Sequence, residues 1–274
     1  MTLNCKQKLI DLTTPKVMGI LNITPDSFYD GGKYKNGDTI VSQVERMLSE
    51  GATFIDVGAY SSRPGADVVP EEEELGRLTP IITLLTQHFP EILLSVDTFR
   101  AKVARACIDL GSALINDISA GHADTDMLPT IAHHQLPYIM MHMRGNPQTM
   151  QQHTDYKDLI VDIRHYFSER VSASRNLKIN DLIIDPGFGF AKTMAQNFEL
   201  LRNLYLLKTL NLPILVGISR KSMIYKTLGT TPQHALNGTT ALHMMALQNG
   251  ANILRVHDVK EAMECIKLYQ MLTH

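Results

Sequence analysis

Three polar residues, Asp97, Asn116 and Asp185, each follow a short apolar run that has the length of a buried strand. Together they offer two carboxylates, which accept hydrogen bonds, and one amide, which both donates and accepts them. Such a set complements the edge of a flat heterocycle that carries an amino group and ring nitrogens. A carboxylate that ends an apolar strand needs a partner, and two parallel N–H donors provide one. Alternatively, the three residues are strand-end caps or general acid–base groups.

A second set of residues has the chemistry of an anion site. Arg63 lies in the segment SSRPG, and Lys221 ends the segment SRK. Arg255 and His257 are two positions apart, so both point to the same face of a strand, which in a barrel is the interior. We therefore expect Arg63, Arg255 and His257 to clamp a phosphate or diphosphate. Asn22 offers an amide oxygen, a hard ligand for a Mg²⁺ ion that keeps most of its waters and bridges phosphates.

Eight short apolar runs, each ending in a polar or charged residue, recur along the chain at intervals of about one strand plus one helix. This pattern is typical of a (β/α)8 TIM barrel, an α/β fold whose active site lies at the carboxyl ends of the strands. The sequence therefore predicts a single barrel of this kind. The predicted strands and their end residues are Val17–Leu21 with Asn22, Phe54–Ile55 with Asp56, Leu93–Val96 with Asp97, Leu114–Ile115 with Asn116, Tyr138–Met141 with His142, Leu182–Ile184 with Asp185, Ile214–Ile218 with Ser219, and Ile253–Val256 with His257.

The length of 274 residues suits one domain, 1–274, in which residues 1–15 form an N-terminal lead-in. The segments 23–37 and 60–69 are longer than a strand-to-helix connection needs, which predicts long active-site loops. Pro80 is expected to kink or split the helix that contains it. The predicted helices are Ile40–Glu50, Pro70–His88, Arg100–Leu110, Tyr156–Asn176, Met194–Leu210, Lys221–Leu228, Pro232–Gln248 and Val259–Leu272.

Composition argues against several kinds of partner. With 26 Lys and Arg against 28 Asp and Glu, the net charge is −2, so no broad basic field is present to attract nucleic acid. No apolar run approaches the roughly 20 residues of a membrane span, and the first residues lack the hydrophobic region of a signal peptide. The three cysteines lack metal-like spacing, which favours reduced thiols in a cytoplasmic protein.

Seven segments that contain these polar residues resemble the dihydropteroate synthase family, whose members are pterin-binding TIM barrels. They follow one another in the same order from the first strand to the last, across essentially the whole chain, which makes the resemblance specific. Any one of them alone would be a weak signal. The segments are GILNITPDSF (19–28), SSRPGA (61–66), SVDT (95–98), NDIS (116–119), DPGFGFAKT (185–193), GISRKS (217–222) and RVHDV (255–259).

The resemblance implies a transferase of folate biosynthesis. Such an enzyme joins 6-hydroxymethyl-7,8-dihydropterin diphosphate to 4-aminobenzoate and releases 7,8-dihydropteroate and diphosphate. The aryl amine is a weak nucleophile, so we expect Mg²⁺-bound diphosphate to leave first and the amine to attack the resulting cation. The resemblance also implies a homodimer and a target for sulfonamides.

The resemblance assigns roles to residues by their positions in these segments. The residues expected to act in catalysis are Arg63, Asp97, Asp185, Lys221, Arg255 and His257. Those expected to bind the pterin diphosphate are Ser62, Arg63, Asp97, Asn116, Ile118, Met141, Asp185, Phe190, Gly217, Lys221, Arg255 and His257. The 4-aminobenzoate site, where sulfonamides compete in this family, is expected to contain Ser27, Phe28, Pro64, Phe190 and Ser222, and Asn22 is the expected Mg²⁺ ligand.

Two positions depart from the family pattern. Ser62 stands where threonine is often expected, and it keeps the hydroxyl donor. Tyr60 stands where glutamate is often expected, which puts an acidic role at that position in doubt.

Three alternatives compete with this interpretation. A pterin-dependent methyltransferase of the same barrel family uses a similar Asp–Asn–Asp set but does not need the diphosphate clamp. A Schiff-base aldolase with Lys221 as nucleophile leaves the Asp97, Asn116 and Asp185 set unexplained, and Lys221 follows its strand instead of lying on it. A catalytically silent pterin-binding paralogue should lack a catalytic group, and the sequence lacks none.

Overall fold

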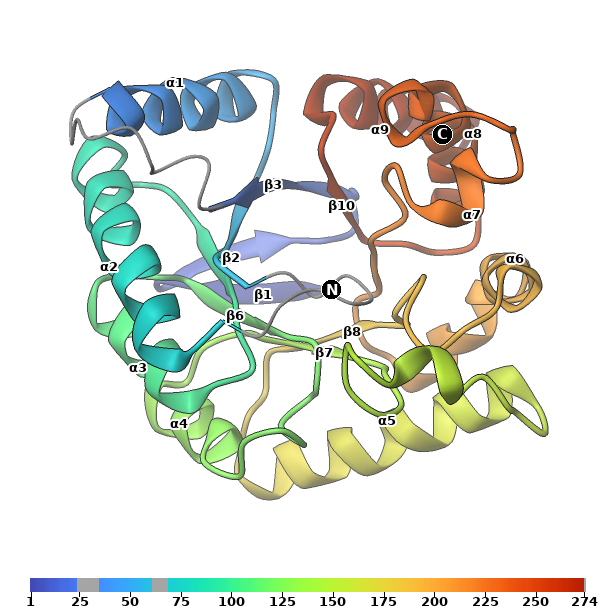
Figure 1. Cartoon of the computed structure of the whole chain (residues 1–274), viewed down its shortest axis with the longest axis horizontal. Coiled ribbons are helices and arrows are strands. Elements are labelled where there is room, and N and C mark those ends of the chain that lie inside the picture. Colours follow the sequence, from blue (N-terminus) through green and yellow to red (C-terminus); the bar gives the residue numbers. More distant parts are fainter. Residues whose placement is uncertain (24–34, 61–68, 274) are drawn as a thin grey trace.

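A computed structural model describes residues 1–23, 35–60 and 69–273, which form a barrel of parallel strands surrounded by helices (Figure 1). The strand order is β8-β7-β6-β5-β4-β3-β10-β9, and a parallel bridge between Ile184 and Ile214 joins the two end strands, so the barrel is nearly closed. The predicted fold is confirmed. The barrel strands are β3 (Lys16–Asn22), β4 (Phe54–Gly58), β5 (Leu94–Asp97), β6 (Leu114–Asp117), β7 (Tyr138–Met141), β8 (Leu182–Asp185), β9 (Leu215–Val216) and β10 (Ile253–Val256).

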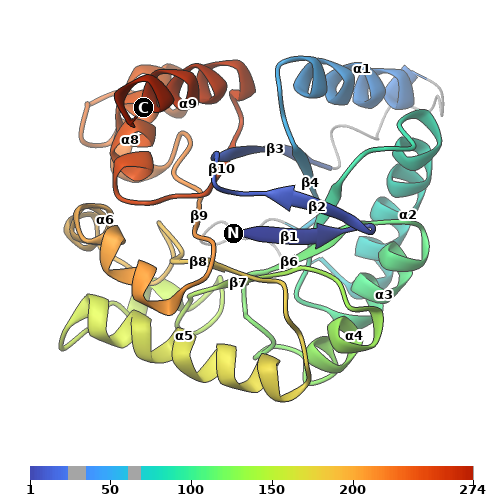
Figure 2. The ribbon, with the colours of Figure 1, turned by 180° about the vertical axis from the view of Figure 1, so that it is seen from behind.

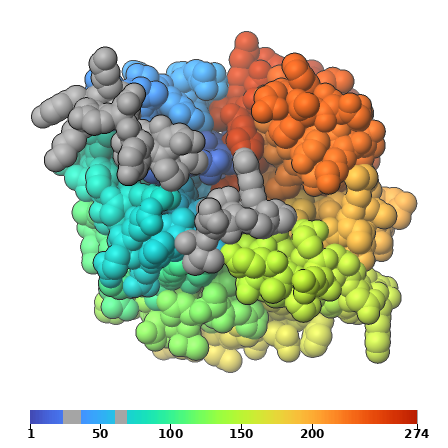
Figure 3. Space-filling view, in the orientation of Figure 1, coloured from blue at the N-terminus to red at the C-terminus, as the bar shows by residue number. Residues whose placement is uncertain are grey.

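The helices follow one another around the barrel in chain order, which the colours of the space-filling view also show (Figure 3). The α-helices are α1 (Lys35–Ser49), α2 (Glu71–His88), α3 (Ala101–Asp109), α4 (Met127–His134), α5 (Leu159–Asn176), α6 (Met194–Arg202), α7 (Ser222–Tyr225), α8 (Leu236–Gln248) and α9 (Val259–Thr273). Shorter 3-10 segments are η2 (Met150–Gln152), η3 (Leu204–Leu210) and η4 (Pro232–His234). None of the described helices is long and apolar enough to cross a membrane.

Several helix boundaries differ from the sequence-based expectation. Pro80 lies inside α2 without dividing it, because Leu78, Ile82 and Leu85 bury the same helix on both sides of the proline. The segment predicted as one helix from Met194 to Leu210 is instead α6 followed by η3. The short helix α4 was not predicted at all, and α1 begins at Lys35 instead of Ile40.

The amino-terminal end of the barrel is covered by a hairpin that the sequence did not reveal. The lead-in contains the antiparallel strands β1 (Thr2–Cys5) and β2 (Lys8–Asp11), which cross the end of the barrel seen in Figure 2. Leu3, Cys5 and Leu12 are buried in one apolar cluster with Met18, Phe54, Leu93, Leu114, Ile139, Ile183, Leu215 and Ile253 from the barrel. This cluster forms the apolar floor of the barrel.

The polar residues lie directly above this floor. Side chains that face the interior recur at every second position of a strand. Two positions beyond the floor residues Phe54, Leu114, Ile183 and Ile253 come Asp56, Asn116, Asp185 and Arg255. The alternation therefore places carboxylates, an amide and a guanidinium in one interior layer, toward the carboxyl ends of the strands.

Candidate active site

The centre of this layer is Arg255, which is bound to carboxylates from two neighbouring strands. Its Nε donates to Asp56 Oδ2 at 2.6 Å, and its Nη2 donates to Asp97 Oδ2 at 2.9 Å. Asn116 Nδ2 donates to the same Asp56 oxygen at 3.0 Å. Four side chains from β4, β5, β6 and β10 thus form one hydrogen-bonded network at the barrel mouth.

Asp56 is the residue of this network to which sequence reasoning gave no role. Its side chain is fully buried, and its Oδ1 has no hydrogen-bond partner among the described residues. The signal was present, because Asp56 ends one of the eight apolar runs, as Asp97 and Asn116 do. The segments that carry the family resemblance do not include Asp56, and no pattern in the sequence shows which carboxylate orients Arg255.

Two roles were expected for Arg255, and the geometry bears on both. The family resemblance implies that it stacks on the pterin face, whereas the residue pattern grouped Arg255 with Arg63 and His257 as part of an anion clamp. Its Nε and Nη2 instead point to Asp56 and Asp97, and such a double contact fixes the plane of the guanidinium. A guanidinium held in this way offers its flat face to an aromatic ring.

The charges of this network follow from burial and pairing. Burial raises the pKa of Asp97 to about 7, with Arg255 opposing the rise and Asp56 adding to it. Burial tends to lower the pKa of Arg255, but Asp56 and Asp97 outweigh it and raise the pKa, so Arg255 stays charged. Asp97 and Arg255 remain 17% and 19% exposed at their side chains, so both can contact a ligand, whereas Asp56 lies beneath them.

Asp185 and Lys221 form the opposite side of the mouth. Asp185 Oδ1 accepts from the backbone N–H of Gly187 at 2.8 Å, and burial raises the pKa of this carboxyl, with Lys221 opposing the rise. Lys221 Nζ donates to the carbonyl oxygen of Phe188 and lies 4.8 Å from the ring centre of Phe190. Burial lowers the pKa of Lys221 to about 8, so the ammonium form prevails at neutral pH.

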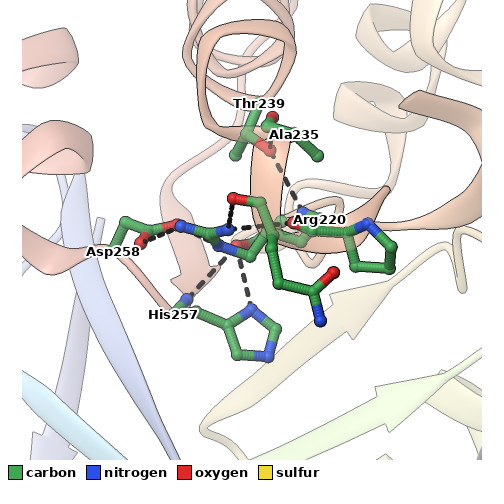
Figure 4. Close-up of polar contacts among 8 residues, drawn as sticks. Arg220, Ala235, Thr239, His257 and Asp258 are labelled. Carbon is green, nitrogen blue, oxygen red and sulfur yellow. Dashed lines mark hydrogen bonds and ion pairs between the residues drawn. The ribbon is translucent and has the colours of Figure 1, made fainter. Parts of the chain in front are cut away.

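His257 lies just past β10 and contacts the end of β9. Its Nδ1 is 3.0 Å from Ser219 Oγ, and its backbone N–H donates to the same oxygen at 3.2 Å. Next to it, Arg220 makes a two-bond ion pair with Asp258, at 2.8 and 2.7 Å, and donates to carbonyl oxygens of η4 (Figure 4). Arg220 therefore ties together the loops that carry Lys221 and His257.

The remaining predicted site residues divide into those that the structure places and those outside the described residues. Ile118, just after β6, and Met141, the last residue of β7, are buried, and a Cβ on Gly217 would lie 3.9 Å from Arg255 Cβ. Ser222 is exposed at the first position of α7. Asn22 ends β3 in register with Gly58 of β4. The residues that lie outside the described ranges are Ser27, Phe28, Ser62, Arg63 and Pro64.

Tyr60 has a packing role that its departure from the family pattern did not predict. Its ring meets Phe99 edge to face at 5.1 Å, and the Arg100 guanidinium lies 5.7 Å from its centre. The position is therefore occupied by an aromatic contact between the loops after β4 and β5.

Fold and site together define a class of protein. Residues 18–257 match the model of the pterin binding enzyme family, so the chain belongs to this family.

Relatives within this class include several dihydropteroate synthases. The enzyme of that name from Synechocystis is 47% identical over 259 residues, which cover 93% of this chain and 89% of the relative. The Yersinia pestis dihydropteroate synthase in a sulfonamide drug complex superposes with a TM-score of 0.93 at 43% identity, covering 100% of this chain and 99% of that one. The Xanthomonas albilineans dihydropteroate synthase with 4-aminobenzoic acid gives a TM-score of 0.91 at 38% identity, covering 99% and 98%.

Proposed function

We propose that this chain condenses 6-hydroxymethyl-7,8-dihydropterin diphosphate with 4-aminobenzoate, to give 7,8-dihydropteroate and diphosphate in folate biosynthesis. The observation that carries the proposal is the network in which Arg255 joins Asp56 and Asp97, with Asn116, Asp185 and Lys221 at the same barrel mouth. The network combines polar groups for a ring edge with a cationic plane for a ring face. The near full-length similarity to dihydropteroate synthases supports the same reaction.

The proposed pterin site uses groups from both sides of the mouth. Asp97, Asn116 and Asp185 bind the amino group and ring nitrogens of the pterin, and paired N–H donors of the ligand offset the cost of burying the carboxylates. Lys221 reaches the ring carbonyl and the neighbouring nitrogen. Arg255 stacks on the ring face, since its edge is already bound to Asp56 and Asp97. The apolar wall consists of Ile118 and Met141.

The proposed chemical step is dissociative. The bond between the pterin methylene and the diphosphate oxygen breaks first, and its electron pair leaves with diphosphate. The cationic methylene is conjugated with the electron-rich dihydropterin, and Asp97 and Asp185 favour it electrostatically in their ionised forms. The aryl amine of 4-aminobenzoate then attacks the methylene and loses a proton. Arg63 and His257 stabilise the departing diphosphate as its charge develops.

The proposed 4-aminobenzoate site contains Ser27, Phe28, Pro64, Phe190 and Ser222. Phe190 lies beside Lys221, which borders the pterin site. This placement brings the aryl amine of 4-aminobenzoate next to the reacting methylene of the pterin. The Xanthomonas albilineans structure holds 4-aminobenzoic acid, which supports the same ligand class for this chain. Competition by sulfonamides at this site is part of the proposal, as the Yersinia pestis complex suggests.

The proposed metal is Mg²⁺, with Asn22 as its protein ligand. Among the described residues no group of three His, Cys, Asp or Glu side chains is arranged to hold a metal. Asn22 of β3 is in register with Gly58 of β4, and Gly58 is in register with Asp97 of β5. Asn22 therefore lies at the same barrel mouth as Asp97. A single hard oxygen fits Mg²⁺, which retains waters and binds substrate phosphates. Bound there, Mg²⁺ would neutralise charge on the leaving diphosphate.

We also propose a homodimer of single-domain, cytoplasmic subunits that bind these small molecules and neither nucleic acid nor membranes. All three cysteines are buried and unpaired, as is usual in reducing compartments. Leu268, Met271 and Leu272 are exposed at i, i+3 and i+4 of α9, on one face of the helix. Burying this face between two copies accounts for its apolar character. Leu268→Asp with Met271→Asp should convert a dimer into a folded monomer in sedimentation equilibrium, and a monomeric wild type at micromolar concentration would refute the dimer.

The decisive experiment is a coupled assay of diphosphate release. Release should require both the pterin diphosphate and 4-aminobenzoate, and 7,8-dihydropteroate should appear in equal amount. Release that does not depend on 4-aminobenzoate, or methyl transfer from a methylated pterin, would overturn the proposed function.

A further inference from the structure

Below the proposed substrate pocket lies a buried lysine that the mechanism above does not use. Lys192, in the loop between β8 and α6, is 3% exposed, and its neighbour His142, just after β7, is 1% exposed. Lys192 Nζ lies 3.0 Å from each of three acceptors: His142 Nδ1 and the carbonyl oxygens of Gly187 and Phe190. Among the described residues Lys192 forms no ion pair with a carboxylate. Burying a lysine costs free energy unless its hydrogen bonds are made. The three contacts of Lys192 offset this cost, and the question is what they stabilise.

The lysine holds a loop that is difficult to form. Gly187, Gly189 and Ala191 all have positive φ, at 71°, 82° and 49°. A Cβ on Gly187 would lie 2.1 Å from the carbonyl oxygen of His142, so the loop packs directly against the His142 backbone. Positive φ is unfavourable for alanine, and the surrounding contacts must stabilise it. Lys192 does so from inside, because its amine binds the carbonyl groups at both ends of the Gly187–Phe190 turn.

The same turn forms the wall of the proposed pocket. Its Phe188 carbonyl accepts from Lys221, and its Phe190 ring lies 4.8 Å from the Lys221 amine. Lys192 therefore binds the turn from the protein side while Lys221 binds it from the pocket side. Because Phe190 O is one of the acceptors of Lys192, the position of the Phe190 side chain depends on this buried contact.

His142 makes the anchor tolerant of proton loss. An ammonium group donates to all three acceptors when His142 carries its proton on Nε2. A neutral amine donates to the two carbonyl groups and accepts from His142 when the ring carries its proton on Nδ1. Burial lowers the pKa of Lys192 to about 7, with Asp185 opposing and Lys221 and Arg144 assisting, and burial lowers the pKa of His142 well below its usual range. Both states occur near neutral pH, and neither breaks a hydrogen bond.

We propose that Lys192, with His142 as its partner, is a positioning residue that sets the Gly187–Phe190 turn so that Phe190 forms its side of the aminobenzoate site. The inference rests on the proposed function, and it adds residues that touch neither substrate. It predicts an effect on 4-aminobenzoate that exceeds the effect on the pterin. Asp185 and Lys221 contact the turn, but the pterin is also held by Asp97, Asn116 and Arg255, which lie on other strands.

The test compares Lys192→Met with the wild type and with Lys178→Met, an exposed lysine just before β8 at the opposite end of that strand. In the diphosphate assay, Lys192→Met should raise the KM for 4-aminobenzoate by about tenfold, the effect of losing one or two buried hydrogen bonds. The Kd of the pterin diphosphate, measured by calorimetry, should change by less than about threefold. Equal losses for both ligands, or an unchanged KM, would overturn the inference.

A second pair of variants carries the test if Lys192→Met does not fold. His142→Gln retains a side chain that can accept or donate, whereas His142→Leu retains neither function. His142→Leu should raise the KM for 4-aminobenzoate, and His142→Gln should restore it to within about threefold of the wild type. Equal KM values for the two variants would contradict a hydrogen-bonding role.

Hydrogen exchange provides a readout that does not depend on activity. Peptides spanning 186–191 should exchange about tenfold faster in His142→Leu than in the wild type, while those within α6 stay unchanged. An absence of turnover in the wild type would refute the proposed function and leave this result intact. Unchanged exchange in 186–191 would refute the positioning role even in an active enzyme.

Discussion

Arg255 Nε lies 2.6 Å from Asp56 Oδ2, although 199 residues separate the two in sequence. Asp56 is fully buried and Arg255 is 19% exposed at the barrel mouth, so the carboxylate fixes from below a guanidinium that a ligand meets from above. The pair links a buried carboxylate beneath the pocket to a guanidinium that a ligand can contact. Its removal should therefore affect both stability and ligand affinity.

Asp56→Asn tests this relationship. The free energy of unfolding should fall by about 3 kcal/mol, because Arg255 loses one of its two carboxylate partners and keeps only Asp97. The Kd of a pterin analogue should rise as well, since Arg255 loses the bond that orients its plane. Urea unfolding and calorimetry give the two values. Glu91→Gln is the matched control, because its pair with Lys8 is 79% and 55% exposed and should contribute less than about 1 kcal/mol.

The pH dependence of stability tests the environment of Asp97. Because burial raises the pKa of Asp97 from 3.8 to about 7, the folded protein binds a proton that the unfolded chain has already released. The contribution of Asp97 to the free energy of unfolding should therefore fall as the pH rises from about 4 to about 7, and the raised pKa of Asp185 acts in the same direction.

Asp97→Asn should flatten this profile, and the exposed Glu264→Gln should not. Urea titrations at several pH values measure it. A difference in stability between the wild type and Asp97→Asn that stays constant across this range would show that Asp97 has an ordinary pKa.

Lys221→Met tests whether Lys221 binds the pterin or acts as a nucleophile. Losing the ammonium should weaken pterin binding by about tenfold or more, the usual effect of a lost charged hydrogen bond. Wild-type affinity should also decline above about pH 8, where the lysine with its lowered pKa loses its proton. Borohydride should leave the mass of the wild-type protein unchanged in the presence of substrate. A trapped adduct that disappears in Lys221→Met would revive the Schiff-base aldolase.

Chelation of divalent metal tests the role of Asn22. Removing Mg²⁺ should lower turnover by about a hundredfold while circular dichroism stays unchanged, because the ion acts on the leaving diphosphate and not on the fold. Asn22→Ala should raise the Mg²⁺ concentration needed for half-maximal rate. An Asn22→Ala enzyme with an unaltered Mg²⁺ requirement would assign the metal to other ligands.

Periodicity was enough to predict the barrel and most of the polar layer. Asp97, Asn116 and Asp185 were found because each ends an apolar run, and alternation by two placed Arg255 on the interior face. What periodicity does not specify is a rotamer. Arg255 could have reached toward the leaving group or toward the carboxylates, and only the three-dimensional arrangement of β4, β5 and β10 decides between them.

Other features depend on contacts that have no local signature. Pro80 is tolerated inside α2 because tertiary packing of the helix outweighs the local break. No pattern in the sequence marks Lys192 as buried, since lysines are mostly exposed, and its burial results from the positive-φ turn that wraps around it. The hairpin of β1 and β2 was missed because its strands, TLNC and KLID, lack the continuous apolar run that marks the barrel strands.

That hairpin has a kinetic consequence. Leu3, Cys5 and Leu12 close the amino-terminal end of the barrel, so a ligand enters only at the carboxyl ends of the strands. In the proposed site the pterin diphosphate lies deeper than 4-aminobenzoate. It must therefore bind before 4-aminobenzoate and cannot dissociate while 4-aminobenzoate blocks the exit. Initial-rate measurements should accordingly show a compulsory order of addition, with the pterin diphosphate first.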